Sequence, residues 1–286
     1  MASQKTIRTI PWKGKKKPEV MRGTPLAPNM AVADRYYGRM RRLIDKMSAT
    51  VQKEIKELFD SEPAQEYFAQ DASIASQARI LTNALQKRFE DLFGFHAAGI
   101  ADQFTDQSLK ASAISLKSSL RELSQGLTLK TDILTGELNQ ALTAMVAENV
   151  GLIKSIPSEY LTQVRGAVMR SITTGRGLAD LVPFLKNYEG VTLRRAQLIA
   201  HDQTRKVYSN INRVRMEKLG IKKFEWLHSS GGQVPRPLHV EMSGNIYSFD
   251  DPPVIDEKTG ERGFPGNLIN CRCRMVPILA FGENNE

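Results

Sequence analysis

Residues 224–277 constrain the fold more than any other part of the chain, because short apolar runs alternate there with glycine and proline turns. One run begins at Phe224, a second spans residues 246–249 after the turn formers at 243–245, and a third spans residues 275–279. Such runs, bounded by turn residues, are typical of strands. The stretch predicts a small antiparallel sheet, with both cysteines of the chain at the start of its last strand.

The residues before this stretch predict a mostly helical region. Apolar side chains recur every three or four positions over residues 34–58 and over 192–219, which gives each segment one apolar face. Shorter helices are expected over about 73–93, 98–125, 130–154, 158–173 and 178–185, separated at Gly94, Gly126, Pro157 and Gly175. The expected fold class is α+β: a helical N-terminal region, then a small C-terminal α+β domain with a short antiparallel sheet.

Residues 1–30 are rich in lysine, proline and glycine and almost lack acidic residues. Such a segment cannot bury enough apolar surface to fold alone, so it predicts a flexible basic arm. The helix over 34–58 continues the positive charge in its first half. The candidate partner-binding residues of the arm and helix are Lys13, Lys15, Lys16, Lys17, Arg39, Arg41 and Arg42.

The net charge of +9 and the isoelectric point near 9.5 permit contact with nucleic acid or with an acidic protein surface. Solvated surface charge without a partner remains the alternative. Composition is otherwise ordinary, with 41% apolar and 25% charged residues. No run of about 18 apolar residues predicts a membrane helix, and the N-terminus lacks the pattern of a secretory signal. Two cysteines predict no disulfide framework, which fits a reducing compartment.

The cysteines suggest a metal site. Cys271 and Cys273 alternate along the chain, so both thiols would point to one side of a strand. His239, with His228 as a further candidate, could complete a tetrahedral zinc site. A packed core, in which His239 bonds to the backbone, is the alternative, and a strained disulfide is a third. A Cys/His nucleophile is also conceivable, but no orienting residue, phosphate loop or carboxylate pair accompanies it, so no catalytic residue and no enzyme is predicted.

The order of these residues resembles the Mu-F-like minor head proteins of tailed phages, also called head morphogenesis proteins. The resemblance covers the last third of the chain, from about Gly177. It departs at residues 231–236, where the acidic residue of the family is absent, so no carboxylate role is assigned to that loop. The residues that carry it are Trp226, Arg236, His239, Gly244, Asp251, Pro265, Gly266, Cys271 and Cys273.

The resemblance implies a structural component of the procapsid and virion. Its expected partners are the portal protein, a major capsid or scaffold protein, and double-stranded DNA bound without sequence preference, but no membrane. The expected location is the phage head, and the host cytoplasm during assembly. A DNA-binding protein delivered with the genome is the alternative. The implied division is an arm (1–30), a helical portal- or capsid-contacting region (31–175), the Mu-F-like domain (176–280) and a tail (281–286).

Overall fold

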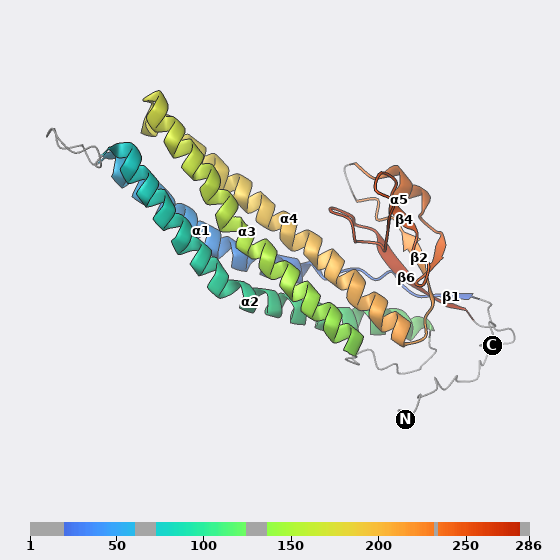
Figure 1. Cartoon of the computed structure of the whole chain (residues 1–286). Coiled ribbons are helices and arrows are strands. Elements are labelled where there is room, and N and C mark those ends of the chain that lie inside the picture. Colours follow the sequence, from blue (N-terminus) through green and yellow to red (C-terminus); the bar gives the residue numbers. More distant parts are fainter. Residues whose placement is uncertain (1–19, 61–72, 124–135, 232–233, 281–286) are drawn as a thin grey trace. The chain divides into compact units, whose positions relative to one another are not determined.

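The computed structural model describes residues 20–60, 73–123, 136–231 and 234–280. The chain forms two compact units. Within the described ranges, the helical unit contains residues 29–60, 73–108 and 139–207, and the sheet unit contains residues 20–28, 109–123, 136–138, 208–231 and 234–280. Neither unit is one contiguous stretch, whereas the sequence analysis divides the chain into consecutive domains. Fold class is confirmed: in the described part of the chain, four long helices precede every strand of the antiparallel sheets except β1 (Val20–Arg22) (Figure 1).

Helix α1 (Met30–Asp60) confirms the helix expected over residues 34–58. Its apolar stripe is buried at every third or fourth position, and Asn29 caps its first turn by accepting a hydrogen bond from the Ala31 N–H at 3.1 Å. In the core of the helical unit, Tyr36 donates a hydrogen bond to Asn149 and stacks on Phe104. The buried residues of the stripe include Tyr36, Met40, Ile44, Met47, Val51 and Ile55.

Three long helices replace the shorter ones expected from glycine and proline. Helix α2 (Ile74–Leu123) passes through Gly94, helix α3 (Gly136–Thr174) through Pro157, and helix α4 (Leu178–Lys218) through Pro183. The predicted breaks at Gly94 and Pro157, and the predicted separation of 178–185 from 192–219, are therefore wrong. Each interior glycine costs about 1 kcal/mol and each proline about 3. Buried apolar residues on both sides of these positions offset that cost.

The sheet unit is built on a four-stranded antiparallel sheet in the order β1-β6-β2-β3. These strands are β1 (Val20–Arg22), β2 (Lys223–Leu227), β3 (Ile246–Ser248) and β6 (Arg274–Ala280). A second sheet pairs β4 (Val254–Asp256) with β5 (Glu261–Arg262), and helix α5 (Pro237–Glu241) follows β2. The antiparallel sheet expected over residues 224–277 is confirmed, although β6 begins one residue after Cys273.

Alternation along β2 places Phe224 and Trp226 in the core of the sheet unit, where both are fully buried. Phe224 packs against Phe249 and Phe264. Helix residues within the same unit add a buried polar network, because Arg215 donates to Ser112, which donates to Asn212. The core of the sheet unit therefore combines packed aromatic side chains with hydrogen bonds between helix residues.

Residues 20–28 do not belong to a flexible arm, contrary to the sequence analysis. Strand β1 pairs with β6, and the Leu26 N–H donates to the Met275 carbonyl at 2.8 Å. Leu26 itself is buried. The unpaired edge of β6 supplies the partner, which local composition cannot reveal. The rest of the arm, including Lys13, Lys15, Lys16 and Lys17, lies outside the described residues.

None of the helices in the described ranges combines the length and hydropathy that crossing a bilayer requires.

Candidate functional site

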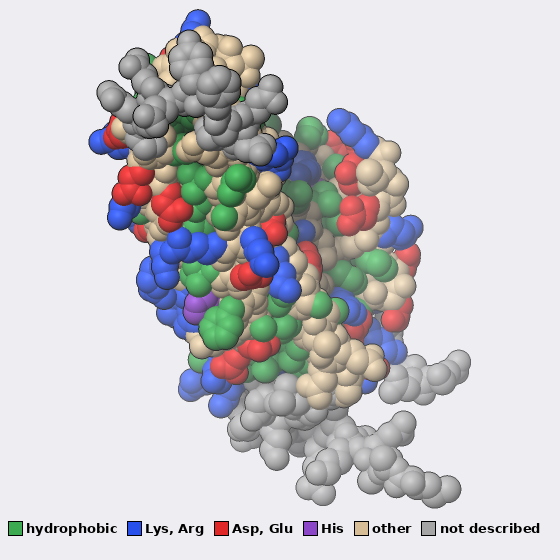
Figure 2. All heavy atoms as spheres, turned by 60° about the vertical axis from the view of Figure 1, so that its left-hand side comes forward, with side chains coloured by type: hydrophobic (Ala, Val, Ile, Leu, Met, Phe, Trp, Pro, Cys, Tyr) green, Lys and Arg blue, Asp and Glu red, His purple; other side chains and the backbone are tan. Residues whose placement is uncertain are grey.

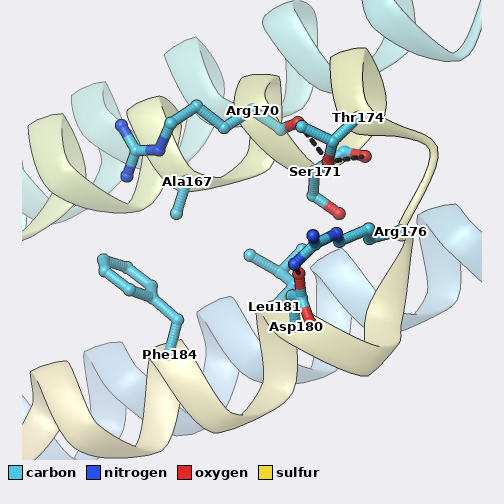
Figure 3. Close-up of a pocket in the computed structure, with 8 residues that line it drawn as sticks. All are labelled: Ala167, Arg170, Ser171, Thr174, Arg176, Asp180, Leu181 and Phe184. Atoms are coloured by element: carbon cyan, nitrogen blue, oxygen red, sulfur yellow. Dashed lines mark hydrogen bonds and ion pairs between the residues drawn. The ribbon is translucent and has the colours of Figure 1, made fainter.

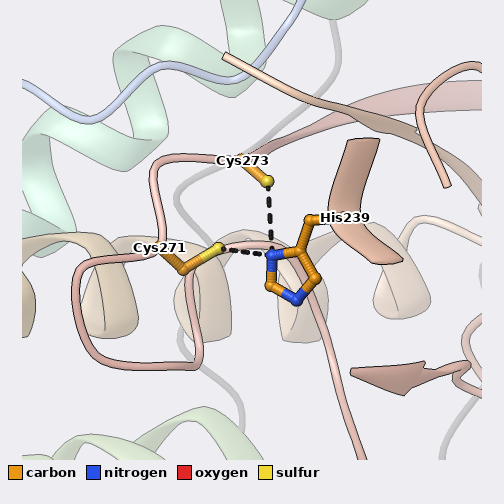
Figure 4. Close-up of side chains that lie close together, drawn as sticks. All are labelled: His239, Cys271 and Cys273. Carbon is orange, nitrogen blue, oxygen red and sulfur yellow. Dashed lines mark hydrogen bonds between the residues drawn. The ribbon is translucent and has the colours of Figure 1, made fainter. Parts of the chain in front are cut away.

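Two histidines and two cysteines meet in the sheet unit, where three segments converge. His228 directly follows β2, His239 lies in the middle of α5, and Cys271 and Cys273 precede β6. Figure 4 shows His239, Cys271 and Cys273 facing one another, with both sulfurs directed at the same imidazole nitrogen. We call these four residues the Cys/His cluster.

The distances within the Cys/His cluster are short. Nδ1 of His239 lies 3.6 Å from Sγ of Cys271 and 3.7 Å from Sγ of Cys273. Nδ1 of His228 lies 3.6 Å from Sγ of Cys273. The potential ligand atoms of His239, Cys271 and Cys273 all lie within 4.8 Å of one another. The structure thus brings together the residues that the sequence analysis named as a candidate zinc site.

The backbone fixes the tautomer of His239. Its Nε2 lies 3.0 Å from the carbonyl oxygen of Ile255, on β4. A carbonyl can only accept a hydrogen bond, so Nε2 carries the proton and donates it. Nδ1 of the neutral ring therefore presents a lone pair to the two sulfurs.

The cluster is sheltered from solvent. Exposure is 2% for His239, 3% for Cys271 and 8% for Cys273, and His228 is half-buried. The indole of Trp226 packs edge-on against the His239 ring, with centroids 5.0 Å apart. Both cysteines are free thiols, not joined in a disulfide. A buried thiol of this kind is closed to a substrate unless the surrounding loops open.

The two thiols have different acidities. Hydrogen bonding from Cys273, supported by the Gly266 N–H, holds the pKa of Cys271 well below its ordinary value despite burial. Donation to Cys271, together with burial, raises the pKa of Cys273. The opposite shifts follow from the contact between the two sulfurs, in which Cys273 donates and Cys271 accepts.

The other residues of the family motif support the loops around the cluster. Gly266, at φ 90°, donates its N–H to Sγ of Cys271 at 3.4 Å, and the preceding Pro265 accepts a hydrogen bond from Ser209 at 2.6 Å. Gly244, at φ 88°, donates to the carbonyl of Trp226 at 2.8 Å. A side chain would be strained at either glycine.

Two charged motif residues hold neighbouring loops. Arg236 donates to the carbonyl of Ile269 at 3.0 Å, one residue before Asn270, which turns the chain into Cys271 at φ 61°. Asp251 forms an ion pair with Arg262. Sequence reasoning missed the Ile255 carbonyl and Ser209, and no signal in the sequence marks either one.

The predicted partner-binding arginines separate into two sets. Arg39 and Arg42 line an open hollow of about 470 Å³ in the helical unit, together with Phe95 and His96. Phe95 is 82% exposed. Arg41 is not among the lining residues and forms an ion pair with Asp45 at 3.5 Å. In Figure 2, Lys and Arg side chains lie near a histidine and an exposed hydrophobic side chain, with Asp and Glu side chains among them.

A second hollow, of about 250 Å³, lies between the end of α3 and the start of α4 (Figure 3). Arg170 and Phe184 face it from opposite helices, while Arg176 is held by Asp180 at 3.0 Å. The Ser171 hydroxyl donates a hydrogen bond to the carbonyl of Gly177 at 2.5 Å. We assign this hollow no chemistry.

Residues 162–276 match the protein family described as phage Mu protein F like protein. The match confirms the expected resemblance and contains the whole Cys/His cluster. Over 254 residues, 88% of this chain is 29% identical to a protein of Haemophilus influenzae (strain ATCC 51907 / DSM 11121 / KW20 / Rd) described as an uncharacterized protein. The chain spans about half of that relative, 53% of its length. No solved structure matches the chain.

Proposed function

We propose that the protein is a minor head protein of a tailed phage, a structural component of the procapsid and virion. The observation that carries this proposal is the match of residues 162–276 to the phage Mu protein F like family. The match includes all of α4, strands β2 to β5 and the first residues of β6. The expected location is the phage head, and the host cytoplasm during assembly.

The proposed partner is the portal protein, with the major capsid or scaffold protein as a further contact. The hollow beside Phe95 supports an interaction with an acidic protein surface, because it combines an 82% exposed aromatic ring with Arg39 and Arg42. Aromatic and arginine side chains are enriched among residues that dominate binding energy. Arginine also pairs with carboxylates through two parallel hydrogen bonds.

Co-expression with the portal protein of the same phage tests this contact. We expect the full chain to co-purify with the portal, and the variant Arg39→Glu/Arg42→Glu to reduce recovery at least about tenfold, since charge reversal replaces attraction with repulsion. Arg41→Glu is the matched control, because it changes charge on the same helix outside the hollow. Equal recovery of all three proteins would contradict the assignment of this surface.

A direct role in DNA contact is a second candidate, favoured by the net charge of +9. Charge-driven binding predicts affinity that is independent of sequence and falls steeply with salt, with a log–log slope of about −0.9 per phosphate neutralised. Affinity that is insensitive to salt would argue against this contact. A portal adaptor without DNA contact would instead bind the portal and show no such affinity alone.

A catalytic role for the Cys/His cluster is not proposed. Cys271 is only 3% exposed, and a nucleophile must reach its substrate. If the cluster were catalytic, Cys271→Ser would abolish turnover while leaving the fold intact. If the cluster is structural, the same change destabilises the sheet unit.

A further inference from the structure

We propose that His228, His239, Cys271 and Cys273 bind one zinc ion in a closed tetrahedral site. The proposal stands on the geometry of the cluster and does not depend on the proposed role in the phage head. Two thiolates and two imidazoles form a ligand set that zinc takes in structural sites. Tetrahedral sites with two sulfur and two nitrogen ligands favour zinc over magnesium or calcium, which prefer oxygen.

The nitrogen-to-sulfur distances suit a shared zinc ion. With Zn–S of about 2.3 Å and Zn–N of about 2.0–2.1 Å, tetrahedral geometry separates a nitrogen ligand from a sulfur ligand by about 3.6 Å. The observed separations are 3.6 and 3.7 Å from His239, and 3.6 Å from His228 to Cys273. His239, Cys271 and Cys273 therefore need little rearrangement to share an ion, whereas the His228 ring, which within the cluster contacts only Cys273, must turn towards the other two ligands.

Both sulfurs converge on one imidazole nitrogen. Nδ1 of His239 has one lone pair, yet two sulfurs lie within 3.7 Å of it. Only one thiol can donate fully into that lone pair. A zinc ion would coordinate Nδ1 and both sulfurs together, and it would balance the charge of the two thiolates.

The groups behind the ligands are those expected around zinc. Ligating histidines usually donate their second ring N–H to a carbonyl or carboxylate, and His239 does so to Ile255 at 3.0 Å. The Gly266 N–H lies 3.4 Å from Sγ of Cys271, where it stabilises a thiolate. Both supporting groups belong to the backbone, so they stay in place when side chains change.

His228 supplies the fourth ligand. Its backbone N–H is held by the Ser243 hydroxyl at 3.0 Å, immediately after β2. Its half-buried ring already lies beside Cys273. A zinc ion bound by these four residues would tie together the end of β2, helix α5 and the start of β6.

Metal analysis of the full chain, purified under reducing conditions without chelator, tests the site. We expect about one zinc ion per chain in the wild-type protein and less than about a tenth of that in Cys271→Ser/Cys273→Ser. His96→Ala is the control, since it removes an exposed histidine outside the cluster and should retain the zinc. Wild-type protein that neither contains zinc nor binds added zinc would overturn the proposal. Zinc retained by the double variant would do the same.

Because the cysteine variants could fail to fold, cobalt(II) titration of the wild-type protein gives an independent measurement. We expect intense visible bands of tetrahedral cobalt and a sulfur-to-cobalt charge-transfer band. In His228→Ala we expect weaker affinity, by at least about tenfold, and an altered spectrum as water replaces the imidazole. An unchanged spectrum and affinity would overturn the assignment of His228. Failure of this test would leave portal co-purification unaffected, so the two proposals fail separately.

Discussion

At the residue scale, the two nitrogens of His239 have different tasks. Nε2 bonds to the Ile255 carbonyl at 3.0 Å, which leaves Nδ1 facing both sulfurs. The orientation of the ring therefore depends on the position of β4. A change that displaces Ile255 should disturb the Cys/His cluster without touching any of its members.

Gly263→Ala provides such a change. A Cβ at residue 263 would lie 2.7 Å from Cδ1 of Ile255, whose side chain is only 1% exposed and has little room to yield. We expect a loss of about 1–3 kcal/mol in the free energy of unfolding, measured by urea denaturation. The control is Gly151→Ala, where the new methyl group meets nothing within 4 Å and α3 should gain about 0.5–1 kcal/mol. Equal stability of the two variants would contradict this expectation.

The buried phenol of Tyr160 should make the free energy of unfolding depend on alkaline pH. Burial raises the pKa of Tyr160 from 10.0 to about 12. The folded protein therefore holds the phenol proton at pH values where the unfolded chain has released it, so stability is full below pH 10 and is lost as pH rises towards 12. Relative to Tyr160→Phe, the wild-type protein should lose roughly 2–3 kcal/mol over that range. Urea denaturation of both proteins at pH 8, 10, 11 and 12 measures this difference, and the same pH dependence in both proteins would contradict the expectation.

Residue types were enough to find the candidate ligands but not their support. Cysteine and histidine are rare and chemically distinctive, so Cys271, Cys273 and His239 stood out in the sequence. Every residue has a carbonyl, so nothing singled out Ile255. The exposed ring of Phe95 was equally hidden, because an aromatic residue in a helix is usually part of the core.

At the element scale, local signals and tertiary packing disagree in the helices. Periodicity predicted α1 well, because its apolar stripe lies on one face. Pro157 suggested a break, and residues 178–185 and 192–219 suggested two helices, yet α3 and α4 are continuous there. A single proline has a fixed local cost, whereas the gain from a continuous buried face depends on partners that the local sequence does not contain.

Strand β1 also depends on a tertiary partner that the local sequence does not reveal. Composition placed it in a flexible arm, but it pairs with β6 and leads into the buried Leu26. Pairing with a strand some 250 residues later leaves no local pattern. The sheet was predictable over residues 224–277, and its fourth strand was not.

Leu26→Ala measures the contribution of this segment. Leu26 is 3% exposed within the aromatic core of the sheet unit, so truncation should cost about 2–4 kcal/mol in the free energy of unfolding. Ile246→Ala on β3 is the control, because that side chain is 42% exposed and should lose less than about 1 kcal/mol. Chemical denaturation of both variants makes the comparison. Similar losses would mean that residues 20–28 contribute little to the sheet unit.

At the scale of the whole molecule, the two proposed roles belong to different units. The hollow lined by Arg39 and Arg42 lies in the helical unit, and the Cys/His cluster lies in the sheet unit. Substitutions in one site should therefore leave the other readout unchanged. The match over residues 162–276 draws on both units, since it runs from α3 through α4 into the sheets.

The pairing of β1 with β6 also sets an order in time. During synthesis, residues 20–22 leave the ribosome long before residues 278–280, to which they pair. Helix α1 makes its buried contacts within the helical unit, whereas α2 and α4 also contribute Leu116, Leu120, Tyr208 and Met216 to the core that the later strands complete. Strand β1 must wait, unpaired, until β6 is complete. Until residues 278–280 have been made, β1 has no partner strand, so the four-stranded sheet can be completed only late in synthesis.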